Sequence, residues 1–418
     1  MYHRATLPNG LTLVAEQHAH VRSVSLGAWV KIGSSLERPQ INGVSHMIEH
    51  MVFKGTETRN PLEIATVLES LGGDLNAYTD RELTCYHATV LREHIGVALD
   101  VVSDLITRPT FPKDQLERER KVLLQELSMI EDSPDDWIND VFFQTVWKEQ
   151  PLGRTVIGSK QTIQGISRAQ LLDFFRNHYR PENIVIAVSG NVDFEVFKAE
   201  CERYFVFPER KPRAGVTKRP VSRYQARKKA LLAATEQTHF LLGFEGIGFR
   251  DPYRFDALIL SFFLGGGMSS RLFQEVREKA GLAYSVECDY IPFTDTGLFT
   301  ISASLAPKSL KQCFAIIGRE IMRLRNEKLT PRELDIVKGQ LRGTILLNSD
   351  QMETRQESLG RNEIVFGRYV SVEEVIAEID RVSADRVQEL ANRIFVPEKE
   401  SIVALSRQKP KNEWLTVF

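Results

Sequence analysis

The feature that most constrains the fold of this 418-residue chain is a faint internal repeat on either side of a basic, proline-containing segment. Three pairs of segments recur in the same order in the two halves: VSLGAWVKIG (24–33) and THFLLGFEGIG (238–248), NAYT (76–79) and LAYS (282–285), and FPKDQLERERKVLLQEL (111–127) and TPRELDIVKGQL (330–341). A period of about 210 residues is too long for a solenoid, so it predicts a duplicated domain.

The basic segment at 207–230 contains Pro208, Pro212 and Pro220 and has no helical periodicity. It predicts an exposed linker that continues into a strand. A nucleic-acid-binding tail is the weaker alternative, because no aromatic platform accompanies the basic residues. The expected organisation is therefore an N-terminal domain (1–207), a linker (208–222) and a homologous C-terminal domain (223–418). Each half mixes alternating strands with amphipathic helices outside a regular βαβ order, which predicts an α+β fold.

Charge and cysteine usage narrow the class of protein. The chain carries 54 Lys and Arg against 55 Asp and Glu, a net charge of −1, which gives no electrostatic footprint for nucleic acid or an anionic membrane. No apolar run is long enough to cross a bilayer, and the N-terminus has no secretory pattern. The four cysteines form no CxxC pair, which suits a reducing compartment. We therefore expect a cytoplasmic protein.

The strongest local signal is VSHMIEHMVFKG, in which His46, Glu49 and His50 form an H-x-x-E-H pattern. The apolar residues around them recur at helical spacing on one side, and the three polar residues share the other side with Phe53. Two histidines four residues apart on one helix face can bind a single metal ion, and a neighbouring carboxylate can then take a proton from water. The alternative is a helix with two incidental histidines on its solvent face.

A second predicted helix, at 114–130, places Glu119 and Glu126 two turns apart in the middle of its apolar side. A carboxylate there must be paired or must bind a cation, because burying it bare costs several kcal/mol. Buried salt bridges are one explanation. Metal binding is favoured because the His-His helix lacks a third protein ligand, and two histidines with one carboxylate form a catalytic zinc set.

These motifs resemble the pitrilysin/insulinase family of zinc peptidases, whose inverted motif is H-x-x-E-H. Other segments are similar to family landmarks along nearly the whole chain: LPNGLTLV, GSSLERPQINGVSHMIEHMVFKGT, GGDLNAYTD, PLGRTVIG, HYRPENIVIAVSGNVD and GGGMSSRLFQEVREKAGLAYS. The length resembles the branch of bacterial and mitochondrial processing peptidases. The resemblance implies two homologous half-domains, each a mainly antiparallel sheet packed with helices, that form half of a clamshell chamber.

The resemblance also implies roles for individual residues. In the family the third ligand lies 76 residues beyond the second histidine, which here is Glu126, and a supporting glutamate seven residues earlier matches Glu119. His46, His50 and Glu126 would hold one zinc ion per chain, with Glu49 as general base. Asn76 and Ala77 match the edge strand on which family members bind the substrate backbone. Arg277 and Tyr284 match a pair of residues that helps to fix the substrate and to stabilise the oxyanion. For Phe53, lining the substrate cleft and packing in the core are equally consistent.

The implied function is a zinc-dependent metalloendopeptidase that cleaves peptides, unfolded polypeptides or presequence-like segments inside a closed chamber. The alternative is a non-catalytic assembly subunit that resembles the core proteins of respiratory cytochrome reductase. Such relatives have degraded metal motifs, whereas this chain keeps every ligand and the base. The second half contains no histidine after His239, so it cannot repeat the zinc site. The resemblance further implies a bacterial protein and a homodimer, with a heterodimer as the alternative.

Overall fold

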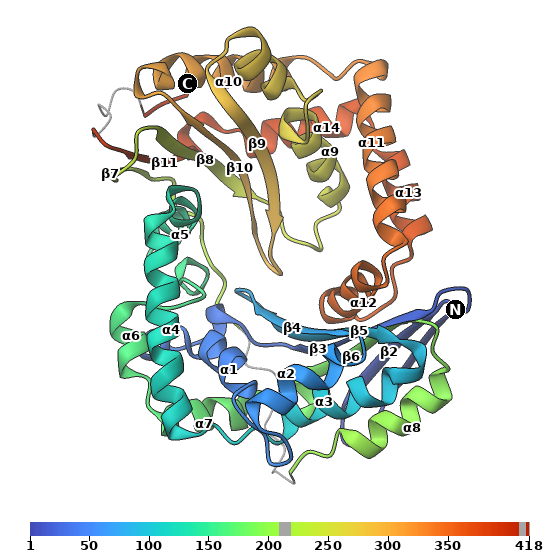
Figure 1. Cartoon of the computed structure of the whole chain (residues 1–418). Coiled ribbons are helices and arrows are strands. Elements are labelled where there is room, and N and C mark those ends of the chain that lie inside the picture. The colour runs from blue at the N-terminus through green and yellow to red at the C-terminus, as the bar shows by residue number, and fades with distance from the viewer. Residues whose placement is uncertain (209–218, 409–414, 418) are drawn as a thin grey trace. The chain divides into compact units, whose positions relative to one another are not determined.

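The structure of the protein is a computed structural model that describes residues 1–208, 219–408 and 415–417 (Figure 1). Most of the predicted linker at 208–222 lies outside these described residues. The chain divides into two compact units, and each unit contains segments from both halves of the sequence. The first unit comprises Met1–Ser128, Arg154–Pro220 and Leu347–Val370, and the second comprises Met129–Gly153, Val221–Leu346 and Ser371–Phe418.

The first unit contains a six-stranded sheet with the strand order β1-β2-β6-β3-β5-β4. β2 and β6 are parallel, and all other neighbouring strands in this sheet are antiparallel. β4, which contains Asn76 and Ala77, is therefore an edge strand. The strands are β1 (Tyr2–Thr6), β2 (Thr12–Gln17), β3 (Ser23–Val30), β4 (Asp74–Thr79), β5 (Thr84–Leu91) and β6 (Ile184–Gly190).

The second unit contains a five-stranded sheet with the order β7-β11-β8-β10-β9, in which only β7 and β11 are parallel. Strand for strand, this order repeats β2-β6-β3-β5-β4 of the first sheet. The predicted α+β fold with two homologous, mainly antiparallel halves is thus confirmed. The strands are β7 (Lys228–Leu232), β8 (Thr238–Gly246), β9 (Ala283–Pro292), β10 (Gly297–Leu305) and β11 (Ser401–Ser406).

Helices pack on both sheets, and two of the points at which the chain passes between units lie within long helices. Those in the first unit are α1 (Val44–Val52), α2 (Pro61–Glu69), α3 (Ile95–Thr107), α6 (Lys160–Gly165), α7 (Arg168–His178), α8 (Phe194–Tyr204) and α12 (Met352–Phe366). Those in the second are α5 (Pro134–Val146), α9 (Arg254–Gly265), the π-helix η6 (Phe273–Lys279), α10 (Leu310–Asn326), α13 (Val372–Arg381) and α14 (Ala384–Ile394). These two long helices are α4 (Lys113–Asp132) and α11 (Pro331–Ser349).

α5 and α12 depart from the predicted domain boundaries, because each packs in the unit built mainly from the other half of the sequence. α12 packs on β6, β3 and β2, on the opposite face of the first sheet from α3 and α8 (Figure 1). α5 packs on β11 and β8. β6 and β3 of the first sheet correspond to β11 and β8 of the second. Each helix therefore packs on the sheet of the other half of the sequence, at the equivalent position. The boundaries 1–207 and 223–418 therefore follow the sequence repeat and not the compact units.

A glycine on each sheet permits this close helix packing. Gly27 on β3 and Gly243 on β8 each follow a leucine in the repeated strand. A Cβ atom at Gly27 would lie 1.8 Å from Gln356 Nε2 of α12, and one at Gly243 would lie 2.3 Å from Phe142 Cζ of α5. Real Cβ atoms essentially never show contacts this short, so a side chain at either position would force the packed helix side chain to shift.

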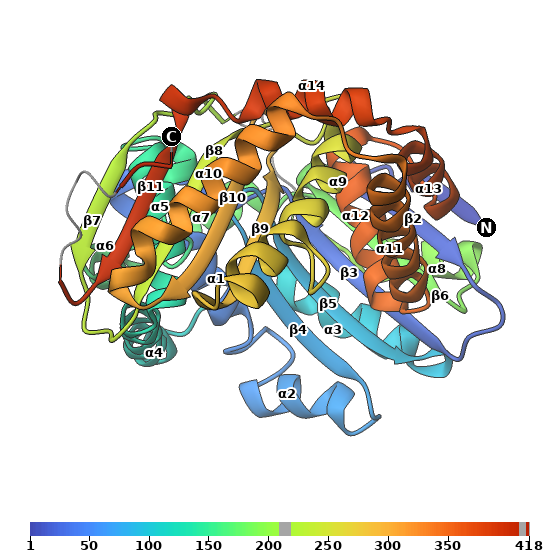
Figure 2. The ribbon, with the colours of Figure 1, turned by 90° about the horizontal axis from the view of Figure 1, so that it is seen from above.

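The second sheet is buried on both faces. Phe240, Leu242 and Phe244 belong to the core shared with α9, α10 and α14, whose helices cover one face (Figure 2). Leu241, which points to the other face because side chains alternate along a strand, packs with α5 residues such as Phe142. The four cysteines are buried and free. Among the described helices, none combines the length and apolar character required to span a bilayer.

Candidate metal centre

The helix that carries the H-x-x-E-H pattern, α1, begins at Val44 and ends at Val52, as its periodicity predicts. Its apolar residues, which include Met47 and Ile48, are fully buried and fix the rotation of the helix about its axis. His46, Glu49 and His50 consequently lie on the other side.

Three side chains of α1 and α4 converge on one point. His46 Nε2 lies 3.7 Å from Glu126 Oε1, and His50 Nε2 lies 3.7 Å from Glu126 Oε2. These distances are too long for hydrogen bonds but near the roughly 3.4 Å between two ligands of a tetrahedral zinc ion. One donor atom from each residue lies within 4.8 Å of the others, and no other trio of His, Cys, Asp or Glu within the described residues meets that spacing. The donor set therefore fits zinc.

Glu119 has a different role from Glu126. Its Oε2 atom lies 3.2 Å from His50 Nδ1, and its Oε1 atom lies 3.0 Å from Lys54 Nζ. This contact fixes His50 in the tautomer that leaves Nε2 open toward Glu126. Glu119 is buried, so Lys54 also compensates its charge. The structure thus places Glu126 opposite both histidines and places Glu119 behind one of them.

Burial shifts the pKa values of His46 and Glu126 toward their neutral forms. The pKa of His46 falls to about 3, first because of burial and second because of the neighbouring His50, so at neutral pH His46 is an uncharged imidazole ready to bind a metal. Burial likewise raises the pKa of Glu126, although His50 opposes the shift. Zinc binding would supply the positive charge that this desolvated carboxylate lacks.

Glu49 is half-buried beside the convergent ligands. Burial raises the pKa of Glu49, while a hydrogen bond from Thr79 and the nearby His50 oppose the increase, and Glu126 adds to it. Its Oε2 atom has no donor among the described groups. A carboxylate with a raised pKa and an unused oxygen is suited to accept a proton at near-neutral pH. No sequence motif assigns Thr79 to the site; it is simply the last residue of the NAYT segment.

The predicted substrate strand has its open edge beside α1. Ala77 pairs with Tyr86 across β4 and β5, but the Ala77 N–H donates to the side-chain oxygen of its own neighbour Asn76, at 2.8 Å. The Asn76 side chain thus satisfies this N–H locally, within the edge strand of the sheet. Phe53, at the end of α1, is half-buried, and its ring centroid lies 6.5 Å from that of Tyr86.

The predicted pair Arg277 and Tyr284 is brought together in the second unit. The Arg277 guanidinium carbon lies 4.6 Å from the centre of the Tyr284 ring and 4.6 Å from that of Phe273. Tyr284 is 79% exposed, so its hydroxyl is accessible. The cation–π contact orients an arginine on η6 against the first strand that follows it, β9.

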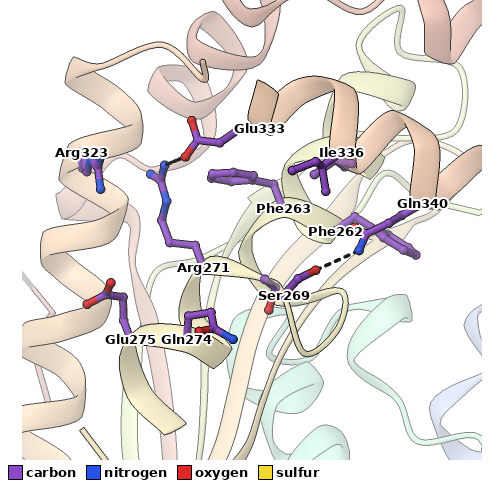
Figure 3. A pocket seen from close by; sticks show the side chains of 12 residues that line it. Phe262, Phe263, Ser269, Arg271, Gln274, Glu275, Arg323, Glu333, Ile336 and Gln340 are labelled. Carbon is purple, nitrogen blue, oxygen red and sulfur yellow. Dashed lines mark hydrogen bonds and ion pairs between the residues drawn. The ribbon is translucent and has the colours of Figure 1, made fainter. Parts of the chain in front are cut away.

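A separate pocket of about 240 Å³ lies in the second unit, between the end of α9, the start of η6, and α11 (Figure 3). Arg271 donates to Glu333 at 2.7 Å, and Gln340 donates to Ser269 at 2.9 Å across this pocket (Figure 3). The Arg271 guanidinium also lies over the Phe263 ring. These contacts join the segment immediately before η6 to α11, so the charge of Arg271 stabilises the fold. None of the predicted site residues lines the pocket.

A duplicated α+β fold that combines an H-x-x-E-H helix with a third glutamate ligand is typical of one class of zinc peptidases. Comparisons with known proteins assign the chain to the same class. Residues 12–160 match the family described as insulinase (peptidase family M16), and residues 165–341 match the peptidase M16 inactive domain. The chain is 36% identical to an uncharacterized zinc protease of Bacillus subtilis, YmxG, over 395 residues that cover 94% of this chain and 96% of the relative. An uncharacterized zinc protease of Rickettsia bellii is 36% identical over 398 residues (95% and 96%). The chain belongs to peptidase family M16, the insulinase family.

Solved structures share the fold at lower sequence identity. A protease of Helicobacter pylori superposes with a TM-score of 0.90 at 21% identity and covers 97% of this chain and 99% of its own. A structure from Pseudomonas fluorescens described as a peptidase M16 inactive domain gives a TM-score of 0.88 at 22% identity, with 98% of each chain covered. The relatives named here are bacterial.

Proposed function

We propose that this chain is a zinc-dependent metalloendopeptidase that hydrolyses short or unfolded polypeptides, including presequence-like segments, within a closed chamber. The observation that carries the proposal is the Glu49 carboxylate, whose buried Oε2 atom has no hydrogen-bond partner among the described groups, beside the convergent donors of His46, His50 and Glu126. The resemblance to processing peptidases supports the kind of substrate.

The chemistry divides between the ion and the side chains. A bound zinc ion would polarise the scissile carbonyl and lower the pKa of an attacking water. Glu49 would accept the proton from that water and deliver it to the leaving amine, which its raised pKa favours. Thr79 holds the carboxylate in place. We further propose that the substrate backbone adds to the open edge of β4 at Asn76 and Ala77, and that Arg277 and Tyr284 fix substrate and stabilise the oxyanion.

The test compares Glu49→Gln with Glu93→Gln, an exposed glutamate in a turn of the same unit. We expect E49Q to bind zinc like the wild type and to lose peptide cleavage by at least roughly 100-fold, while E93Q cleaves normally. Unchanged cleavage by zinc-loaded E49Q would refute the role of Glu49. A folded wild-type protein that neither binds zinc nor cleaves a mixed peptide library would instead favour the assembly-subunit alternative.

Two further parts of the proposal concern assembly and location. We propose that the chain forms a homodimer in the bacterial cytoplasm, because it retains both the zinc motif and the Arg277 and Tyr284 pair, which heterodimeric relatives place on different subunits. Light scattering on purified protein should give about twice the 47.6 kDa mass of one chain. A mass near that of one chain at micromolar concentration would contradict the homodimer, and stable capture of a second, related subunit would favour a heterodimer.

A further inference from the structure

A buried carboxylate from outside α1 caps its first turn. Glu37 Oε2 accepts hydrogen bonds from the Gly43 backbone N–H at 2.7 Å and the Asn42 side-chain amide at 2.8 Å, and its Oε1 accepts from the Ser45 backbone N–H at 2.8 Å. The residue is only 3% exposed. Both oxygens of one carboxylate are therefore used at the start of the helix, immediately before His46.

The helix needs this outside acceptor because its own N-cap position has no side chain. Gly43 has a φ of 95°, and a Cβ atom there would lie 2.4 Å from the backbone oxygen of Ile157. The backbone approach thus requires glycine and prevents the usual Ser, Thr, Asp or Asn cap. Glu37 supplies the missing acceptor, and its negative charge lies at the positive end of the helix dipole.

The same contacts tie the start of α1 to another segment of the first unit. The Asn42 side chain, held by Glu37, also donates to the backbone oxygen of Thr155 at 2.9 Å. The Arg154 side chain donates to the backbone oxygen of Glu37. A Cβ atom at Gly158 would lie 2.4 Å from the Asn42 backbone oxygen. Glu37 therefore fixes the start of α1 against the segment 154–158 as well as capping it.

The neighbouring helix α2 shows that capping alone does not require a buried charge. α2 has nine residues, like α1, and begins with an exposed capping box in which Asn60 and Glu63 bond to each other's backbone N–H groups. Burying the Glu37 carboxylate is costly by comparison, and this desolvation raises its pKa to about 6 despite the hydrogen bonds. The costly arrangement occurs on the helix that carries the metal ligands and the base.

We infer that Glu37 is a positioning residue for the metal centre: it sets the position of α1 so that His46, Glu49 and His50 face Glu126. This inference rests on the proposed zinc function. A nine-residue helix is marginal in isolation, so its termini strongly affect its position. A shift of about 1 Å at the ligands would weaken zinc binding and misplace the base, while the β4 edge that would hold the substrate would stay in place.

The experiment compares Glu37→Gln with Glu63→Gln, which perturbs the cap of α2 in the same chemical way. We expect E37Q to raise the zinc dissociation constant, measured by competition with a chelator, roughly 10-fold or more, as loss of a group supporting metal ligands does. With saturating zinc, kcat should fall while KM changes little. E63Q should match the wild type in zinc affinity, kcat and KM, even if its melting temperature falls.

A second variant keeps the inference testable if E37Q does not fold. Asn42→Ala removes one of the three hydrogen bonds to Glu37 and the bond to Thr155, and we expect a smaller loss of zinc affinity in the same direction. Wild-type zinc affinity and kcat in folded E37Q, or in folded N42A if E37Q is insoluble, would overturn the inference and leave the proposed function intact. Absence of zinc binding by the wild type would overturn both.

Discussion

His50 Nδ1 lies 3.2 Å from Glu119 Oε2, so one nitrogen of this imidazole is held from behind while Nε2 faces Glu126. Lys54 contacts the second oxygen of Glu119 at 3.0 Å. Lys54 thus holds Glu119 in place, and Glu119 in turn orients the predicted metal ligand His50. It also explains why a carboxylate is tolerated on the buried side of α4.

The first prediction follows from this contact. Glu119→Gln should keep the shape of the side chain but remove the charge that orients His50, and we expect zinc affinity to fall roughly 10- to 100-fold. Glu117→Gln is the matched control, because Glu117 is an exposed residue of the same helix that pairs with Arg120. Chelator competition measures both variants. Equal zinc affinity for E119Q and E117Q would show that Glu119 does not support the ligand.

The metal helix could be predicted from the sequence because its information is local. Two histidines four residues apart and an apolar stripe at helical spacing determine one face of α1 without knowledge of the rest of the chain. Periodicity did not separate Glu119 from Glu126, since residues seven apart share a face. Their roles differ because α4 passes α1 so that one glutamate reaches Nδ1 of His50 and the other reaches both Nε2 atoms.

The parts that the sequence did not predict depend on tertiary contacts. Glu37 precedes the N-cap of α1 by six residues, and no local capping pattern includes a residue at that distance. The exchange of α5 and α12 was also missed. An amphipathic pattern tells which face of a helix is buried but not which sheet will cover it, and the two homologous sheets offer equivalent surfaces.

The second prediction concerns this exchange. Gly243→Ala places a Cβ atom 2.3 Å from Phe142 Cζ, and the ring of a buried phenylalanine has little room to move. We expect the variant to lower the free energy of unfolding by about 1–3 kcal/mol. The control is Gly96→Ala in α3, where no atom lies within 4 Å of the added Cβ, so stability should stay level or rise slightly. Urea denaturation distinguishes them, and equal stability of both variants would contradict the packing argument.

The third prediction separates the Arg277 and Tyr284 pair from metal binding. Tyr284→Phe removes an exposed hydroxyl and keeps the ring under the Arg277 guanidinium, so the protein should fold and bind zinc normally. If the hydroxyl stabilises the oxyanion, kcat should fall by about 100-fold or more. Tyr290→Phe, further along β9, is the control and should retain activity. A normal kcat in Y284F would restrict Tyr284 to a structural role.

The fourth prediction uses the burial of Glu37. Its pKa rises from 4.5 to about 6 on folding, so the folded state binds the proton more tightly than the unfolded state. Protonation of Glu37 therefore adds its full contribution to the free energy of unfolding below pH 4.5, and this contribution is lost as the pH rises through 6. A shift of this size corresponds to about 2 kcal/mol. The Arg154 guanidinium, whose own pKa burial lowers, is the charged neighbour that opposes the loss.

The measurement is the difference in unfolding free energy between the zinc-free wild type and zinc-free Glu37→Gln. Because glutamine does not titrate and the two proteins share all other titratable groups, the pH dependence of this difference reports the titration of Glu37 alone. Urea denaturation at pH 4.5 and pH 7 should show the wild type losing about 2 kcal/mol relative to E37Q over this interval. A pH-independent difference would mean that Glu37 keeps an ordinary pKa in the folded protein. In that case solvent or a neighbouring cation must stabilise the carboxylate, and its capping contacts would carry little desolvation cost.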